Sequence, residues 1–590
     1  MNRPTTYSLE DFYHKPLHKS CPKALKASKY LDPSFNLVKL GVNNNILKRV
    51  LKKSSAKKVA QMEIQPTVLP YYAPMLRSSL KKLVLTRYSA QKVMKNSGVK
   101  SIRVAKNTFD SCKYLEDLVV PDVFLWPYLT LAKKLRNLRC IEFTIMDTQI
   151  PNIYNLFTNI TALQSVKVKI IKGSSAHKLD NAKQIAMAWR FLRDLFGLKQ
   201  LKALKMNIEE GCLVNQDYDG FFSKICQLIG GRTNSIEDLD LFLGLETPGD
   251  DDFIENLEAR RFLSEVEELN FRVGNVDESS SKKFYKKRVN LYFPKTKQTD
   301  VSNIISKCLS LKRLSIQSEN DRIIFGDNLF ISRGLKIIDL DLNKSSNEKI
   351  PQTLFALAGG LCNCQLISFN LSLDKIEETT LNELVQIHQT FSPYLEEYHL
   401  KTSNPYTNRK IVSALDQNML NTLVQSLQNS RCIKHLELQL NLETSNSIHN
   451  IQNLVETLSG LIHLDLNVYS VNSKASSCQQ EKSYFELYQG VLSRLEHLRV
   501  KLDDVFVLGD LKGFFSIVSE SENLKKLIVD CEALNEANLD DRESIAQNLA
   551  KLLKLESLLL GSKSKQIQSQ IELIKSSRNE VVLSRNLIEI

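Results

Sequence analysis

Three of the nine histidines in this sequence occupy the same place in a recurring hexamer, each with a charged residue two positions later. The three pairs are His435 with Glu437, His463 with Asp465, and His497 with Arg499. An imidazole changes its charge near neutral pH and can donate or accept a hydrogen bond, so a row of them can bind acidic or aromatic groups of a partner. The alternative is that these exposed positions tolerate any polar residue. No local pair has established ligand spacing, so the sequence predicts no metal ligands.

The hexamer is the element that must position these residues. It has apolar residues at its first, fourth and sixth places, as in 80–85 (LKKLVL) and 555–560 (LESLLL). Its second apolar residue, taken as the anchor of each copy, recurs at Leu83, Leu118, Ile141, Val166, Leu204, Leu239, Leu269, Leu314, Leu340, Phe369, Tyr398, Leu436, Leu464, Leu498, Leu527 and Leu558. Recurrence of this kind indicates stacked supersecondary units.

Each repeated unit is predicted to contain one strand and one helix. Several copies continue the alternation of apolar and polar residues, as in 433–440 (IKHLELQL), which is typical of a half-buried strand. Between hexamers, 420–427 (LNTLVQSL) has apolar residues at i, i+3, i+4 and i+7, which predicts a helix with one apolar stripe. A single unit cannot bury both apolar faces, so neighbouring units must stack with parallel strands.

The hexamers over residues 75–565 resemble the LxxLxL half of the leucine-rich repeat, in particular its ribonuclease-inhibitor-like branch. The resemblance implies an α/β solenoid, or horseshoe, with parallel strands on the concave face and helices on the convex face. It also implies a protein partner, because leucine-rich repeats typically bind proteins. The Asn or Cys that the family places after the hexamer is mostly missing, so the repeats are irregular and degenerate.

Side chains alternate across a strand, so the third and fifth residues of each hexamer should face the concave side. Read in chain order, these positions give an acidic stretch, interrupted by Arg313, and then a stretch that contains the histidines. The first comprises Asp238, Asp240, Glu268, Asp339 and Asp341; the second comprises Glu397, His399, His435, Glu437, His463, Asp465, His497 and Arg499. We predict that these residues bind a protein partner with a basic or mixed surface.

Positive charge is concentrated near the N-terminus. Residues 1–110 contain 22 Lys and Arg against 5 Asp and Glu, a net +17, whereas the remaining 480 residues contain 57 against 61, a net −4. A basic segment attracts polyanions, so the alternative function is binding of RNA, DNA or acidic protein tails through residues 1–110. Solvated surface lysines on helices are the other interpretation of this charge.

The repeat pattern divides the chain into three parts. Residues 1–75 are interpreted as a basic N-terminal cap or adaptor, partly flexible, residues 76–565 as an array of about 16 repeats, and residues 566–590 as a C-terminal cap. The longest interval between anchors predicts a basic insertion near residues 276–300. There Lys282, Lys283, Lys286, Lys287 and Arg288 are expected in an exposed loop, as a nuclear-import signal, an anion contact or a chance cluster.

Catalytic signatures are missing from the sequence. It contains no GxxxxGK[ST] phosphate loop, GxGxxG turn, HExxH metal motif or GxSxG elbow, so we predict a noncatalytic protein without a cofactor. The most apolar stretch, 118–132, is short and interrupted by prolines, so no membrane span is expected. Eleven scattered cysteines favour reduced thiols in an intracellular protein, cytoplasmic or nuclear. The sequence therefore predicts a protein-interaction scaffold or adaptor.

Overall fold

The structure is a computed structural model, and the chain forms two compact units, Met1–Leu245 and Glu246–Ile590, called unit 1 and unit 2. The described residues are 61–64, 80–85, 112–173, 182–209, 212, 228, 236–243, 257–273, 285–293, 299–319, 323–325, 329–345, 349–391, 393–403, 414–442, 448–470, 491–502, 508–531 and 539–560. The predicted C-terminal cap, 566–590, lies outside them, as does the predicted N-terminal segment except for residues 61–64.

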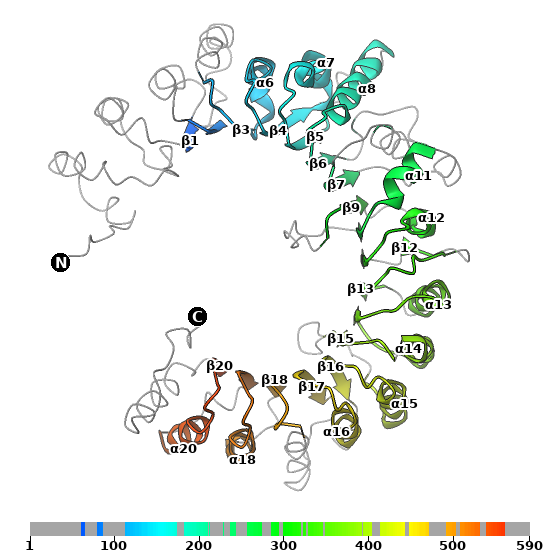
Figure 1. Ribbon diagram of the computed structural model, residues 1–590, viewed down its shortest axis with the longest axis vertical. Coiled ribbons are helices and arrows are strands. Elements are labelled where there is room, and N and C mark those ends of the chain that lie inside the picture. The colour runs from blue at the N-terminus through cyan, green and yellow to red at the C-terminus, as the bar shows by residue number, and fades with distance from the viewer. Residues whose placement is uncertain are drawn as a thin grey trace, which may run out of the picture. The chain divides into compact units, whose positions relative to one another are not determined.

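Unit 1 contains a parallel sheet whose described strands follow one another in chain order (Figure 1). The strands are β1 (Gln61–Ile64), β2 (Lys82–Leu85), β3 (Asp117–Val120), β4 (Cys140–Met146), β5 (Ser165–Ile171), β6 (Ala203–Ile208) and β7 (Asp238–Leu243). The connections include η3 (Val123–Leu125), α6 (Trp126–Ala132), η4 (Asp147–Gln149), α7 (Ile150–Ile153), η5 (Leu156–Asn159) and α8 (Ala182–Phe196).

Unit 2 contains a second run of parallel strands with helices on one side (Figure 1). In spatial order the strands are β9 (Arg288–Phe293), β8 (Glu268–Val273), β11 (Arg313–Glu319), β13 (Ile337–Lys344), β14 (Ser368–Leu373), β15 (Glu397–Thr402), β16 (His435–Leu442), β17 (His463–Ser470), β18 (His497–Leu502), β19 (Lys526–Cys531) and β20 (Ser557–Leu560). The helices are α11 (Leu257–Ser264), α12 (Ser302–Lys307), α13 (Lys349–Leu361), α14 (Glu378–Phe391), α15 (Gln417–Gln428), α16 (Ile448–Thr457), α18 (Leu508–Val518) and α20 (Leu539–Leu549), and the short strands β10 (Thr299–Asp300) and β12 (Ile323–Ile324) pair separately.

Buried anchors explain why these strands form and stack. Every predicted anchor lies in a strand, and the register places anchors side by side, as Leu436 beside Leu464 and Leu464 beside Leu498. These three leucines are 2% exposed or less, and the apolar stripe of α15, including Leu420 and Leu427, is buried with them. Each unit thus has the α/β leucine-rich repeat solenoid fold, in which strand and helix bury their apolar faces against each other.

The anchor predicted at Leu340 is displaced by two residues in the structure. The register pairs Leu314 with Ile338, and Ile338 in turn pairs with Phe369. Residues 335–340 (LKIIDL) and 337–342 (IIDLDL) both match the hexamer, so the pattern alone allowed either frame. As a correction, Asp339 occupies the fifth position of its repeat, and Asp341 lies two residues beyond it.

The predicted basic insertion contains a further repeat strand, β9. Val289 and Leu291 of β9 pair with Leu269 and Phe271 of β8, and all four side chains are buried. Lys286 stands where the hexamer requires its first apolar residue, which hid this copy from the pattern. The strand β9 also breaks chain order, because β8 lies between β9 and β11.

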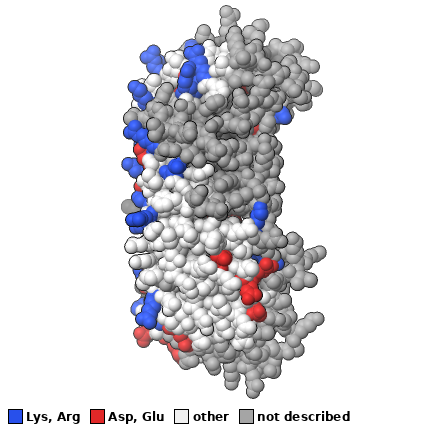
Figure 2. Space-filling model, turned by 90° about the vertical axis from the view of Figure 1, so that its right-hand side faces the viewer, with Lys and Arg blue, Asp and Glu red and all other residues white. Residues whose placement is uncertain are grey.

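The helix side of unit 2 carries few charges around α13, α14 and α15. Across these three helices the acidic and basic residues are Lys349, Glu378 and Glu383. Figure 2 views this side and shows large uncharged areas between small charged groups. The third and fifth hexamer positions lie on the opposite face of the sheet, which helices do not cover. We call this face the open face of unit 2.

Candidate functional site

The third hexamer positions form a continuous row along the open face of unit 2. Parallel pairing from β14 to β20 places these side chains next to one another in the order Ser368, Glu397, His435, His463, His497, Lys526 and Ser557. Adjacent strands lie about 4.8 Å apart, so neighbours in this row are within side-chain contact. We call His435, His463 and His497 the histidine row.

The three imidazoles of the histidine row stack face to face. The ring centroids of His435 and His463 are 4.0 Å apart with 24° between the ring planes. Those of His463 and His497 are also 4.0 Å apart, with 13° between the planes. The sequence predicted that these residues share a repeat position, and the register brings all three together.

The middle and last members of the row are held in their neutral form. Burial is the largest cause that lowers the pKa of His463 to about 4, and repulsion from His435 and His497 contributes to this decrease. Burial likewise lowers the pKa of His497, with a contribution from the positive charge of Lys526. At neutral pH these two imidazoles therefore offer uncharged rings with free nitrogen lone pairs.

Glutamate and lysine side chains border the row. The carboxylate of Glu397 lies 3.6 Å from Nδ1 of His435, at the β15 side. On the β19 side, Lys526 is paired in register with His497. The row therefore runs from an acidic neighbour to a basic neighbour.

The fifth hexamer positions form a second row, in which charges compensate one another. Nδ1 of His399 lies 2.6 Å from Glu437, and Lys401 approaches the same carboxylate at 2.8 Å. Burial alone would raise the pKa of Glu437, but the hydrogen bonds from His399 and Lys401 bring it down to about 2. In the next two strands, Arg499 lies 3.4 Å from Asp465.

Asp465 behaves differently from Glu437 although both are acidic residues at the fifth position. The pKa of Asp465 is raised to about 6, chiefly by burial; Arg499 opposes this increase, and the nearby charge of Glu437 adds to it. A longer contact with a single guanidinium compensates the buried charge less well than two short contacts do. Within the second row, the charge of Glu437 is therefore fully paired, whereas that of Asp465 is only partly compensated.

The predicted acidic stretch does not form a surface of exposed carboxylates. Asp238 and Asp240 lie on β7 in unit 1, whereas the other members lie in unit 2. As a correction, Glu268 is only 1% exposed and accepts a hydrogen bond from Asn270 at 3.3 Å. In the register of the sheet, Glu268 lies between Arg288 of β9 and Arg313 of β11.

The two aspartates of β13 are also engaged within the sheet. Asp339 pairs with Arg313 at 2.5 Å and accepts a hydrogen bond from Asn370. Asp341 accepts one from Gln317 at 3.1 Å. The arginine that interrupts the acidic stretch in the sequence thus neutralises part of it.

The predicted basic loop is only partly described, because Lys282 and Lys283 lie outside the described residues. As a correction, Arg288 begins β9 and is 9% exposed, so it is not in an exposed loop. The Lys287 ammonium lies 2.6 Å from Glu265 and 4.8 Å from the ring centre of Phe262. The backbone N–H of Lys286 donates to Glu267 at 3.0 Å.

The second hexamer position carries an ion-pair pattern that the sequence analysis did not identify. Lys434 pairs with Glu396 at 2.9 Å, and Lys525 pairs with Glu496 at 2.8 Å. At the same hexamer position, the Lys312 ammonium forms an ion pair with the Glu267 carboxylate at 2.8 Å. These ion pairs could have been predicted from opposite charges at the second hexamer position of adjacent repeats.

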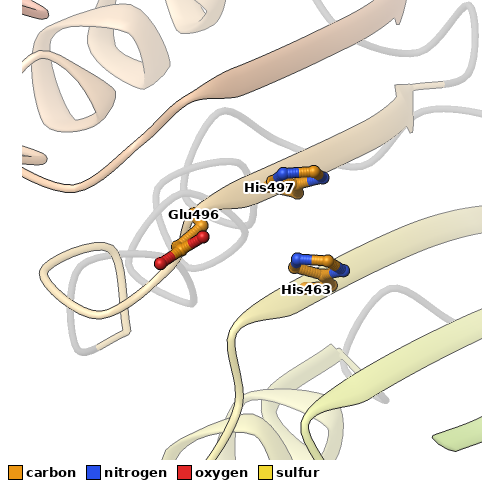
Figure 3. A group of neighbouring side chains, drawn as sticks. All are labelled: His463, Glu496 and His497. Atoms are coloured by element: carbon orange, nitrogen blue, oxygen red, sulfur yellow. The ribbon is translucent and has the colours of Figure 1, made fainter. Parts of the chain in front are cut away.

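Glu496 is the functional candidate that sequence reasoning missed. It immediately precedes β18, and its carboxylate lies beside the stacked rings of His463 and His497 (Figure 3). One ligand atom from each of these three residues lies within 4.8 Å of the other two. Glu496 was overlooked because it stands at the second, not the third, hexamer position.

No described helix combines the length and apolar character that a membrane span requires.

No protein-family model matches the sequence, and no curated protein matches it. Similar solved structures include one of a Rad7 and Elc1 complex in yeast, with 14% identity, a TM-score of 0.27, and coverage of 80% of this chain and 97% of that chain.

Another similar structure is of the Toll–Spatzle complex in Drosophila, with 10% identity, a TM-score of 0.31, and coverage of 81% of this chain and 56% of that chain. A glycosylated form of that complex matches at 11% identity and a TM-score of 0.32, with coverage of 80% of this chain and 56% of that chain. This chain therefore spans little more than half the length of the Toll–Spatzle chains that it matches.

Proposed function

We propose that this chain is a noncatalytic scaffold or adaptor that binds a protein partner on the open face of unit 2. The observation that carries the proposal is the stacking of His435, His463 and His497, with ring centroids 4.0 Å apart in both pairs. Strand pairing on both sides fixes the positions of these residues, so little conformational entropy is lost when a partner binds.

The chemistry of the row favours a partner with a mixed surface and an aromatic or acidic side chain at its centre. Neutral stacked imidazoles present aromatic edges together with hydrogen-bond donors and acceptors. The charge of Glu437 beside the row is already compensated by His399 and Lys401, and Asp465 is paired with Arg499 at a longer distance. Binding over the row therefore does not require the partner to neutralise the buried charge of Glu437.

We also propose the ribonuclease-inhibitor-like branch of the fold and an intracellular site of action, cytoplasmic or nuclear. The lengths of α15 and α14, 12 and 14 residues, support the ribonuclease-inhibitor-like branch. In shorter repeats the connections between strands are irregular and lack helices of this length. Thiols that form no disulfide support the intracellular site: Cys140, Cys308, Cys362, Cys364 and Cys432. Unpaired cysteines are typical of reducing compartments.

Quantitative partner capture tests the binding proposal. The bait is the full chain, compared with a variant in which His435, His463 and His497 are all replaced by alanine. The matched control replaces Asn382, Gln386 and Gln389 of α14 by alanine, because these side chains are exposed on the helix side. We expect the histidine variant to lose its main partners by at least tenfold, since central interface residues often contribute about 2 kcal/mol or more each.

Two outcomes contradict the proposal. One is an unchanged set of captured proteins with the histidine variant. The other is a loss of the same proteins with the α14 variant alone, which would assign the interface to the helix side. Circular dichroism melting curves of both variants must match that of the native chain, so that a lost interaction is not a lost fold.

A further inference from the structure

We propose that His463, Glu496 and His497 form a binding site for a divalent transition-metal ion of the Zn²⁺ class. Two imidazoles and one carboxylate are a ligand set that zinc uses in proteins, with a remaining position for water or another ligand. The three side chains come from two adjacent strands, β17 and β18, and from the residue just before β18 (Figure 3). The inference concerns the isolated chain and goes beyond the proposed partner binding.

The spacing of the ligand atoms is close to what an ion requires. They all lie within 4.8 Å of one another. Zinc holds its ligands at about 2.0–2.2 Å, so two tetrahedral ligand atoms lie about 3.3–3.6 Å apart. A closure of roughly 1 Å is therefore sufficient, which side-chain rotation supplies without movement of the strands.

Ring orientation is the main change that binding demands. The rings of His463 and His497 are stacked with 13° between their planes, whereas a metal ion lies near the plane of each imidazole that it binds. At least one ring must turn about its terminal torsion. All three side chains are half-buried, and those of His463 and His497 lie on the open face of the sheet, so such a turn is not blocked by the core.

Backbone pairing and Lys525 hold the three ligands in place. The N–H groups of Glu496 and His497 both donate to the carbonyl oxygen of Ile462, at 2.9 and 3.3 Å. Lys525 donates to one oxygen of Glu496 at 2.8 Å, and a carboxylate has a second oxygen with which to bind an ion. Residues that orient ligands in this way commonly tune metal affinity.

Neighbouring histidines are less suited to the same role. The carboxylate beside His435 is Glu397, on the side away from His463. His399 is tied to Glu437 at 2.6 Å in the second row. The combination of two adjacent imidazoles and a nearby ionised carboxylate occurs, among the residues that the structure describes, at His463, Glu496 and His497.

The test is metal titration of the full, untagged chain after treatment with a chelator. Zn²⁺ binding is measured by calorimetry, and Co²⁺ is used as a spectroscopic probe of the ligand type. We expect one saturating equivalent at this site, with affinity at least about tenfold weaker in His463→Ala, His497→Ala and Glu496→Gln, since even residues that orient ligands contribute 10–100-fold. The Co²⁺ spectrum should contain no thiolate charge-transfer band.

Matched controls separate this site from others on the chain. Glu396→Gln removes the carboxylate that pairs with Lys434 just as Glu496 pairs with Lys525, and it should leave affinity unchanged. A Cys362→Ser and Cys432→Ser double variant removes two thiols that are exposed in the described part of the chain, and it should also bind normally. No saturable binding, equal binding in the three ligand variants, or a thiolate band would overturn the proposal. Melting curves without metal establish that each variant is folded.

Discussion

His388 shows how a buried polar side chain is satisfied within a repeat. It lies on α14 and is 1% exposed, with Nδ1 2.7 Å from the Ser426 hydroxyl and Nε2 3.0 Å from the Tyr398 hydroxyl. Ser426 donates its own hydrogen to the carbonyl oxygen of Leu423 at 2.7 Å. Nδ1 must therefore carry the proton, and Nε2 accepts from Tyr398, which explains a tyrosine at an anchor position.

The burial of His388 predicts a loss of stability in mild acid. Burial lowers the pKa of His388 to about 3, below its value of about 6.5 in an unfolded chain. At a pH between these two pKa values, His388 is protonated in the unfolded chain but not in the folded chain. The free energy of unfolding therefore decreases as the pH falls below about 6.5. For this residue the loss at pH 5 is about 2 kcal/mol.

Urea unfolding of the native chain and of His388→Gln at pH 7 and pH 5 measures this effect. The variant has no titratable group at this position, so we expect a smaller decrease in stability between the two pH values. His463 and His497 also have lowered pKa values and act in the same direction in both proteins. An equal decrease in the two proteins would show that His388 does not contribute.

At the scale of elements, two adjacent glycines in α13 should respond oppositely to the same substitution. A Cβ on Gly359 would meet no atom within 4 Å, so Gly359→Ala should stabilise the helix by about 0.5–1 kcal/mol. A Cβ on Gly360 would lie 3.1 Å from the carbonyl oxygen of Leu329 and 3.2 Å from the Ile331 side chain. Gly360→Ala should therefore gain nothing or destabilise.

Thermal unfolding of the two single variants tests this contrast. Both replace glycine by alanine in the same helix, so each serves as the control for the other. Equal gains in melting temperature would mean that the segment around Leu329 moves away from α13 at little cost in free energy. Equal losses would mean that the helix requires glycine at both positions for another reason.

Most strands could be predicted from the hexamers because a buried apolar anchor is a strong local signal. The exceptions have physical reasons. Lys286, which is exposed, stands in place of the first apolar residue before β9, so the hexamer pattern is broken there. In β13, Ile338, Leu340 and Leu342 all point to the same face, so the sequence allowed either Ile338 or Leu340 as the anchor. The structure pairs Leu314 with Ile338.

The candidate site was predictable only in part. Repeat position placed His435, His463 and His497 in one row, and pairing confirmed it. Their stacking could not be predicted, because it depends on side-chain torsions. The pairing of Glu268 with Arg288 involves β9, which the hexamer pattern does not reveal, and the approach of Glu496 to His463 joins residues from different repeats.

At the scale of the whole molecule, charge is distributed unevenly along the chain. Residues 1–110 carry a net +17, and the other 480 residues carry a net −4. The described exposed charges of unit 2 are often paired across strands, as Lys434 with Glu396 and Lys501 with Asp530. Any affinity for a polyanion should therefore depend on the N-terminal segment.

This asymmetry predicts salt-dependent binding to single-stranded RNA. Replacing Lys52, Lys53, Lys57 and Lys58 by Gln should reduce the slope of log affinity against log salt by up to about 3, because each neutralised phosphate contributes about 0.7. The control makes the same replacement at four exposed lysines elsewhere, Lys134, Lys199, Lys551 and Lys554, and should leave the slope unchanged. Filter binding across a salt series measures both. Absence of binding at low salt, or an equal effect of the control, would remove residues 1–110 as a polyanion site and leave the open face of unit 2 as the proposed binding surface.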